Sequence, residues 1–333
     1  MKTDFTALEL CAGAGGQALG LERAGFAHAG LVELDHHCCA SLRANRPSWR
    51  VVQADLNEVD PAPFKGVDLV AGGLPCPPFS IAGRQLGAAD SRNLFPAALR
   101  IISEIQPKAV LFENVKGLLA ASFSEYREWM SHELVSMGFI PEWRLLNASD
   151  YGVPQLRPRA VMAAMREDLY PFFGWPVRNG PAPPTVGEVL YDLMSARGWN
   201  GADEWRARAN DIAPTIVGGS HKHGGPDLGP TRAKRAWAEL GVDGMGVANE
   251  APDPGCEGMP RLTVRMVARL QGFPDNWIFT GGKTAQYRQV GNAFPPPVAE
   301  AVATQIRRAF QEFPVERETK TGLQLSLWPP KAS

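Results

Sequence analysis

The first 165 residues alternate short apolar runs with segments of helical periodicity, and this alternation limits the fold more than any other feature. Short strands separated by helical patterns are typical of a parallel α/β sheet with helices packed on its faces. We therefore predict strands at 7–10, 29–34, 49–53, 67–71, 109–112, 143–146 and 160–165, with helices at 16–24, 36–45, 95–105 and 125–137.

A change of composition at 179–184, where the sequence reads Asn-Gly-Pro-Ala-Pro-Pro, indicates a linker. From there to about residue 260 the periodicity fades, while glycine, proline and basic residues accumulate. Helical patterns return at 261–271 and again after the proline run at 295–297. The predicted units are an α/β domain over 1–178, a small irregular domain over 179–260, C-terminal helices over 261–313 that complete the first domain, and a flexible tail over 314–333.

The composition shows no excess of positive charge, because 34 Lys and Arg residues are balanced by 35 Asp and Glu residues. A nucleic-acid partner would therefore require positive charge that is gathered locally. The five cysteines lack the spacing of a disulfide framework, which indicates a reducing, cytosolic compartment. The N-terminal apolar run leads straight into a glycine turn, so we expect neither a signal peptide nor a membrane span.

A glycine-rich turn, Cys11 to Gly16, follows the first predicted strand and opens a helix. Glycine lets the backbone turn sharply and approach a ligand at the helix N-terminus. Glu33 ends the next strand, where a carboxylate can accept hydrogen bonds from ribose hydroxyls. The turn also fits the looser dinucleotide fingerprint, so by itself it does not separate nicotinamide from S-adenosylmethionine. A tight turn without a ligand stays an alternative.

Further candidate residues follow the later strands. Cys76 lies in a proline-flanked loop after a buried strand. A lone cysteine is more often a small buried hydrophobe, but this loop lies at the carboxyl end of a strand, where open α/β sheets bind ligands. The next strand leads to Glu113, which places a carboxylate at the same edge. Arg157 and Arg159 enter a further strand two residues apart, so an extended backbone points both to one face.

In this order the segments resemble the motif set of the bacterial-type DNA (cytosine-5) methyltransferase family. No single tripeptide is specific, but seven motifs in the family's order over about residues 5 to 310 are very unlikely by chance. The matching segments are the glycine turn with Glu33 and Asp55-Leu56, Pro75-Cys76, Glu113-Asn114-Val115, Gln155-x-Arg157-x-Arg159, the stretch 261–274, and Gln289-Val-Gly-Asn-Ala293.

The resemblance implies a Rossmann-like fold of the S-adenosylmethionine-dependent methyltransferases: a mostly parallel sheet with helices on both faces, plus a small target-recognition domain. It implies that Cys76 attacks carbon 6 of a cytosine flipped out of double-stranded DNA, after which carbon 5 accepts the methyl group. Glu113 would relieve the charge on the ring and Arg159 would hold the base oxygen. Arg157 would steady the loop or the oxyanion.

S-adenosyl-L-methionine is accordingly the expected cofactor, with Glu33 on its ribose, Asp55 near its adenine amine and Asn292 near its methionine end. One departure is Pro77, where many family members have glutamine; it puts in doubt only the conformation of the loop over the base. The residues expected at the cofactor are Leu10, Cys11, Gly13, Gly15, Gly16, Glu33, Leu34, Asp55, Leu56, Pro75, Leu94, Asn292 and Ala293.

Basic and polar residues gather at 215–237, where the family has its variable target-recognition region. Such a stretch suits loops that follow a groove and its phosphates, although a solvated charged face explains any single residue as well. One sequence does not say which bases are read. The residues expected at DNA are Ser80, Arg84, Gln155, Ser220, His221, Lys222, His223, Arg232, Lys234 and Arg235.

The run His36-His37-Cys38-Cys39 looks like a metal cluster, but adjacent side chains on a helix diverge, so we predict no metal. Three alternative functions stay open: a cytosine methyltransferase acting on RNA, a catalytically silent cofactor-binding DNA module, and a nicotinamide dehydrogenase, which explains only the glycine turn. We expect a cytoplasmic, nucleoid-associated monomer in restriction-modification or defence. Its expected partners besides DNA are a cognate restriction endonuclease or defence-system proteins.

Overall fold

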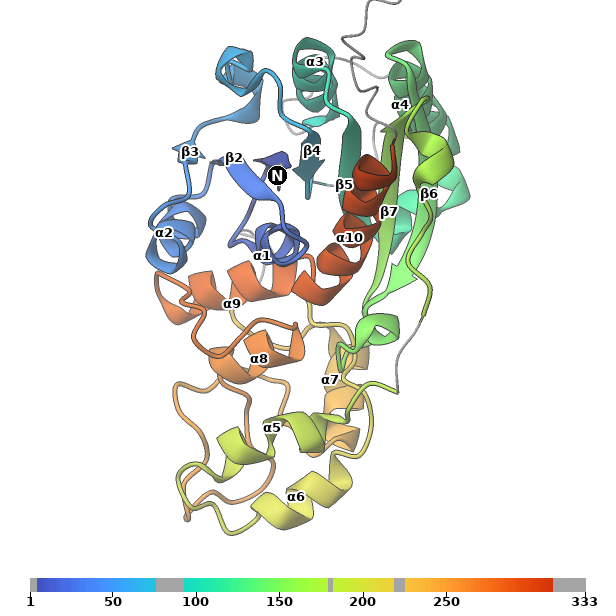
Figure 1. Ribbon diagram of the computed structural model, residues 1–333. Helices are drawn as coiled ribbons and strands as arrows, with labels where there is room; N and C mark the ends of the chain where they lie inside the picture. Colours follow the sequence, from blue (N-terminus) through green and yellow to red (C-terminus); the bar gives the residue numbers. More distant parts are fainter. Residues whose placement is uncertain (1–4, 76–92, 179–181, 219–224, 314–333) are drawn as a thin grey trace, which may run out of the picture.

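The computed structural model describes residues 5–75, 93–178, 182–218 and 225–313, and its first part is a seven-stranded sheet (Figure 1). The strand order is β3-β2-β1-β4-β5-β7-β6. The strands from β1 to β5 run parallel, whereas β7 is antiparallel to both of its neighbours. The strands are β1 (Thr6–Leu10), β2 (Ala27–Glu33), β3 (Val51–Gln53), β4 (Leu69–Gly72), β5 (Ala109–Val115), β6 (Phe139–Asn147) and β7 (Pro158–Arg166).

Helices from both ends of the described chain pack against this sheet. They are α1 (Gly16–Arg23), α2 (His36–Asn45), α3 (Phe95–Ile105), α4 (Ser124–Ser136) and α10 (Pro296–Glu312). One apolar core lies between the sheet and α3 with α4, and a second lies between the opposite face and α1 with α10. Successive strand residues point to opposite faces, so Leu69 belongs to the second core and its neighbour Val70 to the first.

The contact between α1 and α10 brings the end of the described chain back to its beginning. Gly20 on α1 lies so close to α10 that an added Cβ would be 2.5 Å from the Cβ of Ala299 and 2.6 Å from the carbonyl oxygen of Pro296. A side chain at this position would push the two helices apart. Glycine at position 20 therefore sets the spacing of this helix pair.

A second part of the chain forms its own apolar core, and in Figure 1 it lies below the sheet. Its helices are α5 (Val186–Ser195), α6 (Ala202–Arg208), α7 (Thr231–Glu239), α8 (Val264–Leu270) and α9 (Lys283–Asn292). The first three occupy the stretch that we predicted to be irregular, so that expectation is corrected. Trp205 and Trp237 anchor α6 and α7 in the core, and helices this short show too few buried positions for periodicity to reveal them.

Most predicted elements are present with shifted ends. Helices α2 and α3 have the predicted bounds. Strand β5 continues to Val115, so Glu113 lies within the strand. In place of the helix predicted at 261–271, α8 begins only after Thr263, whose side chain caps it. No helix in the described residues is long and apolar enough to cross a membrane. Short 3-10 helices lie at Leu56–Glu58 (η1), Ala62–Phe64 (η2), Lys116–Leu119 (η3), Ala121–Phe123 (η4), Ala148–Tyr151 (η5) and Tyr170–Phe172 (η6).

Candidate active site

The carboxyl ends of the parallel strands open into a cavity of about 640 Å³. Its walls include Glu9 and the glycine turn from β1, Glu33 at the end of β2, Pro75 after β4, and Glu113 on β5. The end of α9 and the segment 215–218 line the other side. A cavity of this size at this edge suits a nucleotide-like ligand, because open α/β sheets bind ligands at the carboxyl ends of their strands.

The turn after β1 combines an open side with a tightly packed side. Its backbone is left-handed at Cys11 (φ 53°), Gly13 (φ 56°) and Gly15 (φ 89°), a conformation that favours glycine. A Cβ on Gly13 would meet no described heavy atom within 4 Å, whereas one on Gly16 would lie 2.3 Å from the carbonyl oxygen of Phe294. Gly13 therefore faces the cavity, and Gly16 permits close packing behind it.

Glu33 has a fixed orientation on the cavity wall. Its Oε2 accepts a hydrogen bond from the backbone N–H of Gly13 at 2.7 Å, and its Oε1 accepts from Leu34 and Asp35 at 2.8 Å each. Burial raises the pKa of the Glu33 carboxyl, although these three hydrogen bonds act in the opposite direction. The carboxylate is thus held in place before any ligand arrives.

Glu113 and Arg159 form a buried ion pair with 2.7 Å between Oε1 and Nε. They come from adjacent antiparallel strands, with Val115 opposite Arg159, so both side chains lie on one face of the sheet. Burial raises the pKa of Glu113 despite the nearby charges of Arg159 and Arg157, and burial lowers the pKa of Arg159. The cavity therefore contains a carboxyl group that holds a proton more readily than usual, beside a fixed cation.

Asn114 connects the strand of Glu113 to the chain after β4. Its Nδ2 donates a hydrogen bond to the carbonyl oxygen of Leu74 at 2.9 Å. This contact holds the end of the described segment in the same cavity wall as Glu113, where Pro75 also lies. Cys76, the predicted nucleophile, is the next residue along the chain and lies outside the described residues.

Arg157 does not line the cavity as described, and its side chain is fully buried. Its guanidinium donates to the carbonyl oxygens of Ile216 at 2.6 Å, Gly291 at 2.7 Å and Ala293 at 3.0 Å. These contacts tie backbone segments together behind the cavity wall. Arg157 is nevertheless near enough to Glu113 to lower the pKa of that carboxyl.

Seven of the thirteen residues predicted at the cofactor line the cavity. Those that line the cavity are Cys11, Gly13, Gly16, Glu33, Pro75, Asn292 and Ala293. The other six do not line it as described. Leu10 and Leu56 are core residues, and Leu94 packs against the core. Gly15 is closely packed, Asp55 caps η1, and Leu34 is 63% exposed.

The residues predicted to contact DNA fall into three groups. Gln155 is fully buried and uses both ends of its amide in hydrogen bonds, so it is not exposed to DNA in the structure as described. Arg232 and Arg235 are exposed on α7, while Lys234 between them pairs with Asp227 at 2.7 Å. The remaining predicted residues, Ser80, Arg84, Ser220, His221, Lys222 and His223, lie outside the described residues.

Sequence reasoning missed two buried polar residues of the cavity wall. Glu9 on β1 and Gln17 on α1 are 1% and 3% exposed and line the cavity. Among the described residues, Glu9 Oε2 and Gln17 Oε1 have no hydrogen-bond partner. The pKa of the Glu9 carboxyl is raised, mainly because the group is buried. An acid between two leucines in an apolar strand is a signal that identifies Glu9 in retrospect.

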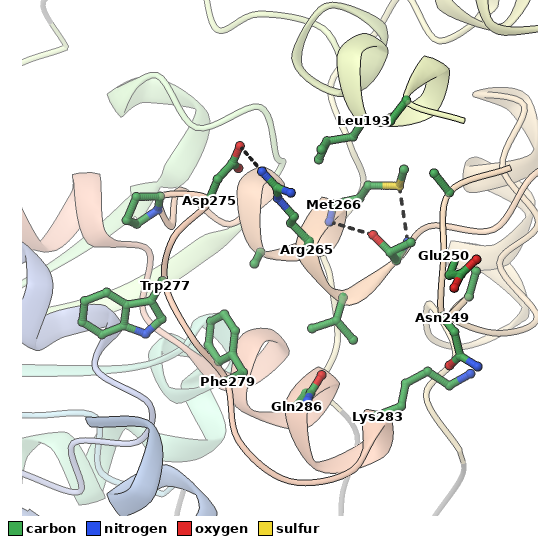
Figure 2. Close-up of a pocket in the computed structure, with 17 residues that line it drawn as sticks. Leu193, Asn249, Glu250, Arg265, Met266, Asp275, Trp277, Phe279, Lys283 and Gln286 are labelled. Carbon is green, nitrogen blue, oxygen red and sulfur yellow. Dashed lines mark hydrogen bonds and ion pairs between the residues drawn. The ribbon is translucent and has the colours of Figure 1, made fainter. Parts of the chain in front are cut away.

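A second cavity of about 620 Å³ lies in the other part of the molecule, and it contains none of the predicted site residues (Figure 2). It lies between α5, α8 and the start of α9, with Trp277 and Phe279 in its lining. Its charged groups are largely paired: Arg265 contacts Asp275 at 3.1 Å, and Glu250 pairs with Arg197.

The two histidine side chains at the start of α2 lie closer together than the sequence predicted. The rings of His36 and His37 do not diverge but lie with their centroids 3.8 Å apart. Within the ranges that the structure describes, no three His, Cys, Asp or Glu side chains are grouped as metal ligands would be. Burial also raises the pKa of the Cys39 thiol to about 11, which disfavours the thiolate that metals bind.

The fold and the cavity define a Rossmann-like α/β protein with a buried Glu–Arg ion pair beside a cavity that suits a nucleotide-like ligand. Residues 5–308 match the sequence model described as C-5 cytosine-specific DNA methylase. The chain therefore belongs to this family, and it is a DNA cytosine-5 methyltransferase. The predicted family and fold class are confirmed, and the reading as a nicotinamide dehydrogenase is set aside.

Individual relatives agree with this assignment. The Type II methyltransferase M.NaeI of Lentzea aerocolonigenes is 58% identical over 308 residues, which cover 91% of this chain and 74% of the relative. M.NgoMIV of Neisseria gonorrhoeae is 50% identical over 92% of this chain and 99% of its own length. A crystal structure of a prophage-encoded E. coli DNA modification methyltransferase matches 93% of this chain and all of its own, with a TM-score of 0.67 at 25% identity. DNMT2 of Spodoptera frugiperda matches 92% of this chain and all of its own, with a TM-score of 0.64; at 18% identity it shows the fold alone.

Proposed function

We propose that the enzyme recognises one short sequence in double-stranded DNA, flips its cytosine into the cavity and transfers the methyl group of S-adenosylmethionine to carbon 5. One observation carries the proposal: the buried Glu113–Arg159 pair shares a cavity with the glycine turn, next to the residue that precedes Cys76. A base placed against this pair would meet the cofactor at the same edge of the sheet.

The chemistry requires activation of the cytosine ring, because carbon 5 of an aromatic ring is a weak nucleophile. Attack of the Cys76 thiolate on carbon 6 breaks the double bond between carbons 5 and 6 and makes carbon 5 enamine-like. Glu113, which holds a proton readily, donates to ring nitrogen 3, and Arg159 holds the carbonyl oxygen of the base. After methylation, loss of the proton on carbon 5 and expulsion of Cys76 restore the ring.

The cavity fits S-adenosylmethionine, which supplies a methyl group on a sulfonium when bound. Gly13 leaves the turn open, Glu33 presents a carboxylate suited to ribose hydroxyls, and Asn292 lies on the wall formed by α9. The unpartnered oxygens of Glu9 and Gln17 need hydrogen-bond donors, and the ammonium of a methionine moiety carries such donors. Asp55 near the adenine amine stays part of the proposal.

Contacts to duplex DNA would come from the loop after Cys76 and from the second part of the chain. Arg232 and Arg235 on α7 are exposed cations suited to phosphate oxygens. The stretch 219–224 lies just before this helix in sequence, and we propose that its Ser220, His221, Lys222 and His223 approach the bases or the backbone. We propose that Ser80 and Arg84, which lie outside the described residues, also contact DNA.

The relatives are named Type II methyltransferases, and we propose the corresponding biological role for this chain. It would methylate the target sites of its host and so protect them from a cognate restriction endonuclease. One candidate active site and one proposed recognition part in a single chain suffice for this reaction, so we propose that the enzyme acts as a monomer.

The test is to express the full chain in a host that lacks cytosine methylation and to sequence the genome after bisulfite treatment. Near-complete methylation of carbon 5 at one short motif is expected, and Cys76→Ala should abolish it. The alanine variant should still bind S-adenosylhomocysteine, because the proposed role of Cys76 is to attack the base and not to hold the cofactor. A folded wild-type enzyme that binds S-adenosylhomocysteine yet leaves the genome unmethylated would overturn the proposal and redirect attention to RNA.

A further inference from the structure

The segment 213–218, which leads into the proposed recognition stretch, lies alongside the residues that lead into β7. Ala213 and Gln155 form a parallel β-bridge. The backbone N–H of Leu156 donates to the carbonyl oxygen of Ala213 at 2.8 Å. The hydroxyl of Thr215 donates to the carbonyl oxygen of Leu156. The segment therefore behaves as a short extra strand beside the chain that delivers Arg159 to the cavity.

Arg157 joins this segment to the end of α9. It bonds the carbonyl oxygen of Ile216 on one side and those of Gly291 and Ala293 on the other. Gly291 and Ala293 flank Asn292, and all three line the cavity. One fully buried guanidinium thus connects the segment 213–218, the recognition side of the cavity wall, with the end of α9, its cofactor side.

Two buried glutamines make a second connection between the same elements. Gln155 Oε1 accepts from the backbone N–H of Ile216 at 3.0 Å, and its Nε2 donates to Gln271 Oε1 at 2.6 Å. Gln271 in turn donates from its Nε2 to the carbonyl oxygen of Ala293 at 2.7 Å. Both glutamines are 0% exposed. The backbone N–H of Ile216 is therefore bonded to Gln155, and its carbonyl oxygen is bonded to Arg157.

The two sides also touch directly, without space for a side chain. A Cβ on Gly291 would lie 2.3 Å from the Cα of Gly218, and a Cβ on Gly218 would lie 2.2 Å from Oδ1 of Asn292. Contacts this close transmit a displacement of one segment to the other, because packed interiors leave no free volume to absorb it.

We propose that Gln155, Arg157 and Gln271, the buried junction, couple the binding of target DNA at the recognition side to the binding of cofactor in the cavity. The inference rests on the proposed function of that cavity. None of the three side chains lines the cavity as described, so they are positioning residues that act through Ile216, Gly291 and Ala293.

The direction of the coupling follows from the shared wall. Residues 215–218 line the cavity, so a ligand there stabilises the arrangement of the segment that leads to the recognition stretch. DNA that fixes the same arrangement removes part of the ordering that the cofactor would otherwise impose. Both ligands therefore favour one state of one segment, and each tightens the binding of the other by the same factor.

The experiment measures the dissociation constant of S-adenosylhomocysteine by calorimetry, with the full chain alone and with a duplex that contains the methylated target. We expect DNA to tighten binding about tenfold in the wild type, within the usual range for coupled sites. Gln271→Met keeps the length of the side chain and removes its amide. It should reduce the factor below about twofold and leave the affinity without DNA nearly unchanged.

Ser41→Ala is the matched control. Ser41 is 0% exposed and does not line the cavity as described. Its hydroxyl donates to Gln289 Oε1 at 2.6 Å and accepts from the backbone N–H of Thr280 at 2.8 Å, which ties α2 to α9 and not to the recognition segment. This variant should lose similar stability and keep the tenfold factor. The proposal fails if Gln271→Met keeps the full coupling, or if the control loses it equally.

Gln155→Met breaks the other end of the junction and must reproduce the result of Gln271→Met. If neither variant folds, the junction is purely architectural and the inference is overturned. If the wild type methylates DNA and binds S-adenosylhomocysteine with an affinity that DNA does not change, the inference fails while the proposed function stands. If the wild type neither methylates DNA nor binds S-adenosylhomocysteine, the proposed function itself fails.

Discussion

The sheet and the part that carries α5 to α8 are stabilised by different kinds of contact. In the sheet, strands of alternating sidedness separate two apolar cores, and its most deeply buried acids, Glu9 and Glu113, both line the cavity. In the second part, short helices surround an apolar core that contains large side chains such as Trp205, Trp237 and Tyr287. Charged side chains join many of its elements.

Arg269 at the end of α8 shows the second kind of contact best. It bonds Asp192 on α5, Asp275 in the turn after α8, and the carbonyl oxygen of Val189. These bonds raise the pKa of Arg269 and lower the pKa of both aspartates. The helices are thus connected by specific polar pairs near the surface, where a single substitution changes one contact at a time.

The difference matches the proposed function, in which the sheet carries the chemistry and the second part contacts the target DNA. Chemistry needs groups held within a fraction of an ångström, which adjacent strands provide for Glu113 and Arg159. Recognition of different target sequences needs segments that can vary without disturbing the core. The buried junction connects the two parts. The difference between a packed sheet and a second part held by polar pairs leads to four predictions, from the largest expected effect to the smallest.

Loss of the carboxyl group in the sheet should affect the reaction most. Glu113→Gln should lower the single-turnover rate of methyl transfer by about 10²- to 10⁴-fold, the usual contribution of a general acid. The matched control is Glu142→Gln on β6, outside the cavity as described, which should leave the rate unchanged. Transfer of a labelled methyl group to a target duplex measures both. A loss below about tenfold would remove Glu113 from the mechanism.

Truncation in the sheet core should cost the most stability. Phe112→Ala removes a side chain that is 1% exposed between β5 and α3, and it should lower the free energy of unfolding by about 3–5 kcal/mol. Val135→Ala on α4, where the side chain is 53% exposed, should change it by less than about 0.5 kcal/mol. Urea unfolding followed by circular dichroism compares the two. Equal effects would contradict the core described here.

Breaking the polar network of the second part should cost less and depend on salt. Arg269→Ala should lower the free energy of unfolding by about 1–2 kcal/mol, because two of its partners are partly exposed and screened by solvent. High salt should reduce the difference from the wild type, whereas the effect of Phe112→Ala should persist. Thermal melting at low and high salt gives the comparison. A salt-independent effect would mean that Arg269 acts mainly through packing.

A histidine on strand β2 should produce the smallest effect, a dependence of stability on pH. Burial lowers the pKa of His28, whose Nε2 lies 3.0 Å from the carbonyl oxygen of Ala18. The unfolded chain takes up the proton at higher pH, so this contribution to stability is complete above pH about 6.5 and is lost as the pH falls below it. Between pH about 6.5 and 5.5 the wild type should therefore lose more stability than His28→Gln. Urea titrations at the two pH values measure this difference, and parallel pH profiles would contradict it.

The sequence alone predicted those elements and candidate site residues whose signal lies in neighbouring residues of the chain. The glycine turn, Glu33 and Glu113 each stand at the end of, or within, an apolar run, and parallel strands bring such positions to one edge. The bounds of α2 and α3 followed from periodicity and from the prolines beyond them. For the same reason the family was recognisable, because its motifs are short, contiguous and ordered along the chain.

Only the tertiary structure decided what Gln155, Arg157 and Gln271 do, since their partners lie 59 to 136 residues away along the chain in most of these bonds. Spacing indicated that Arg157 and Arg159 share a face, but not that one is enclosed by backbone carbonyls while the other reaches Glu113. A hydrogen bond depends on which donor and acceptor meet when water is excluded. That meeting is set by the packing of distant segments, which no local pattern contains.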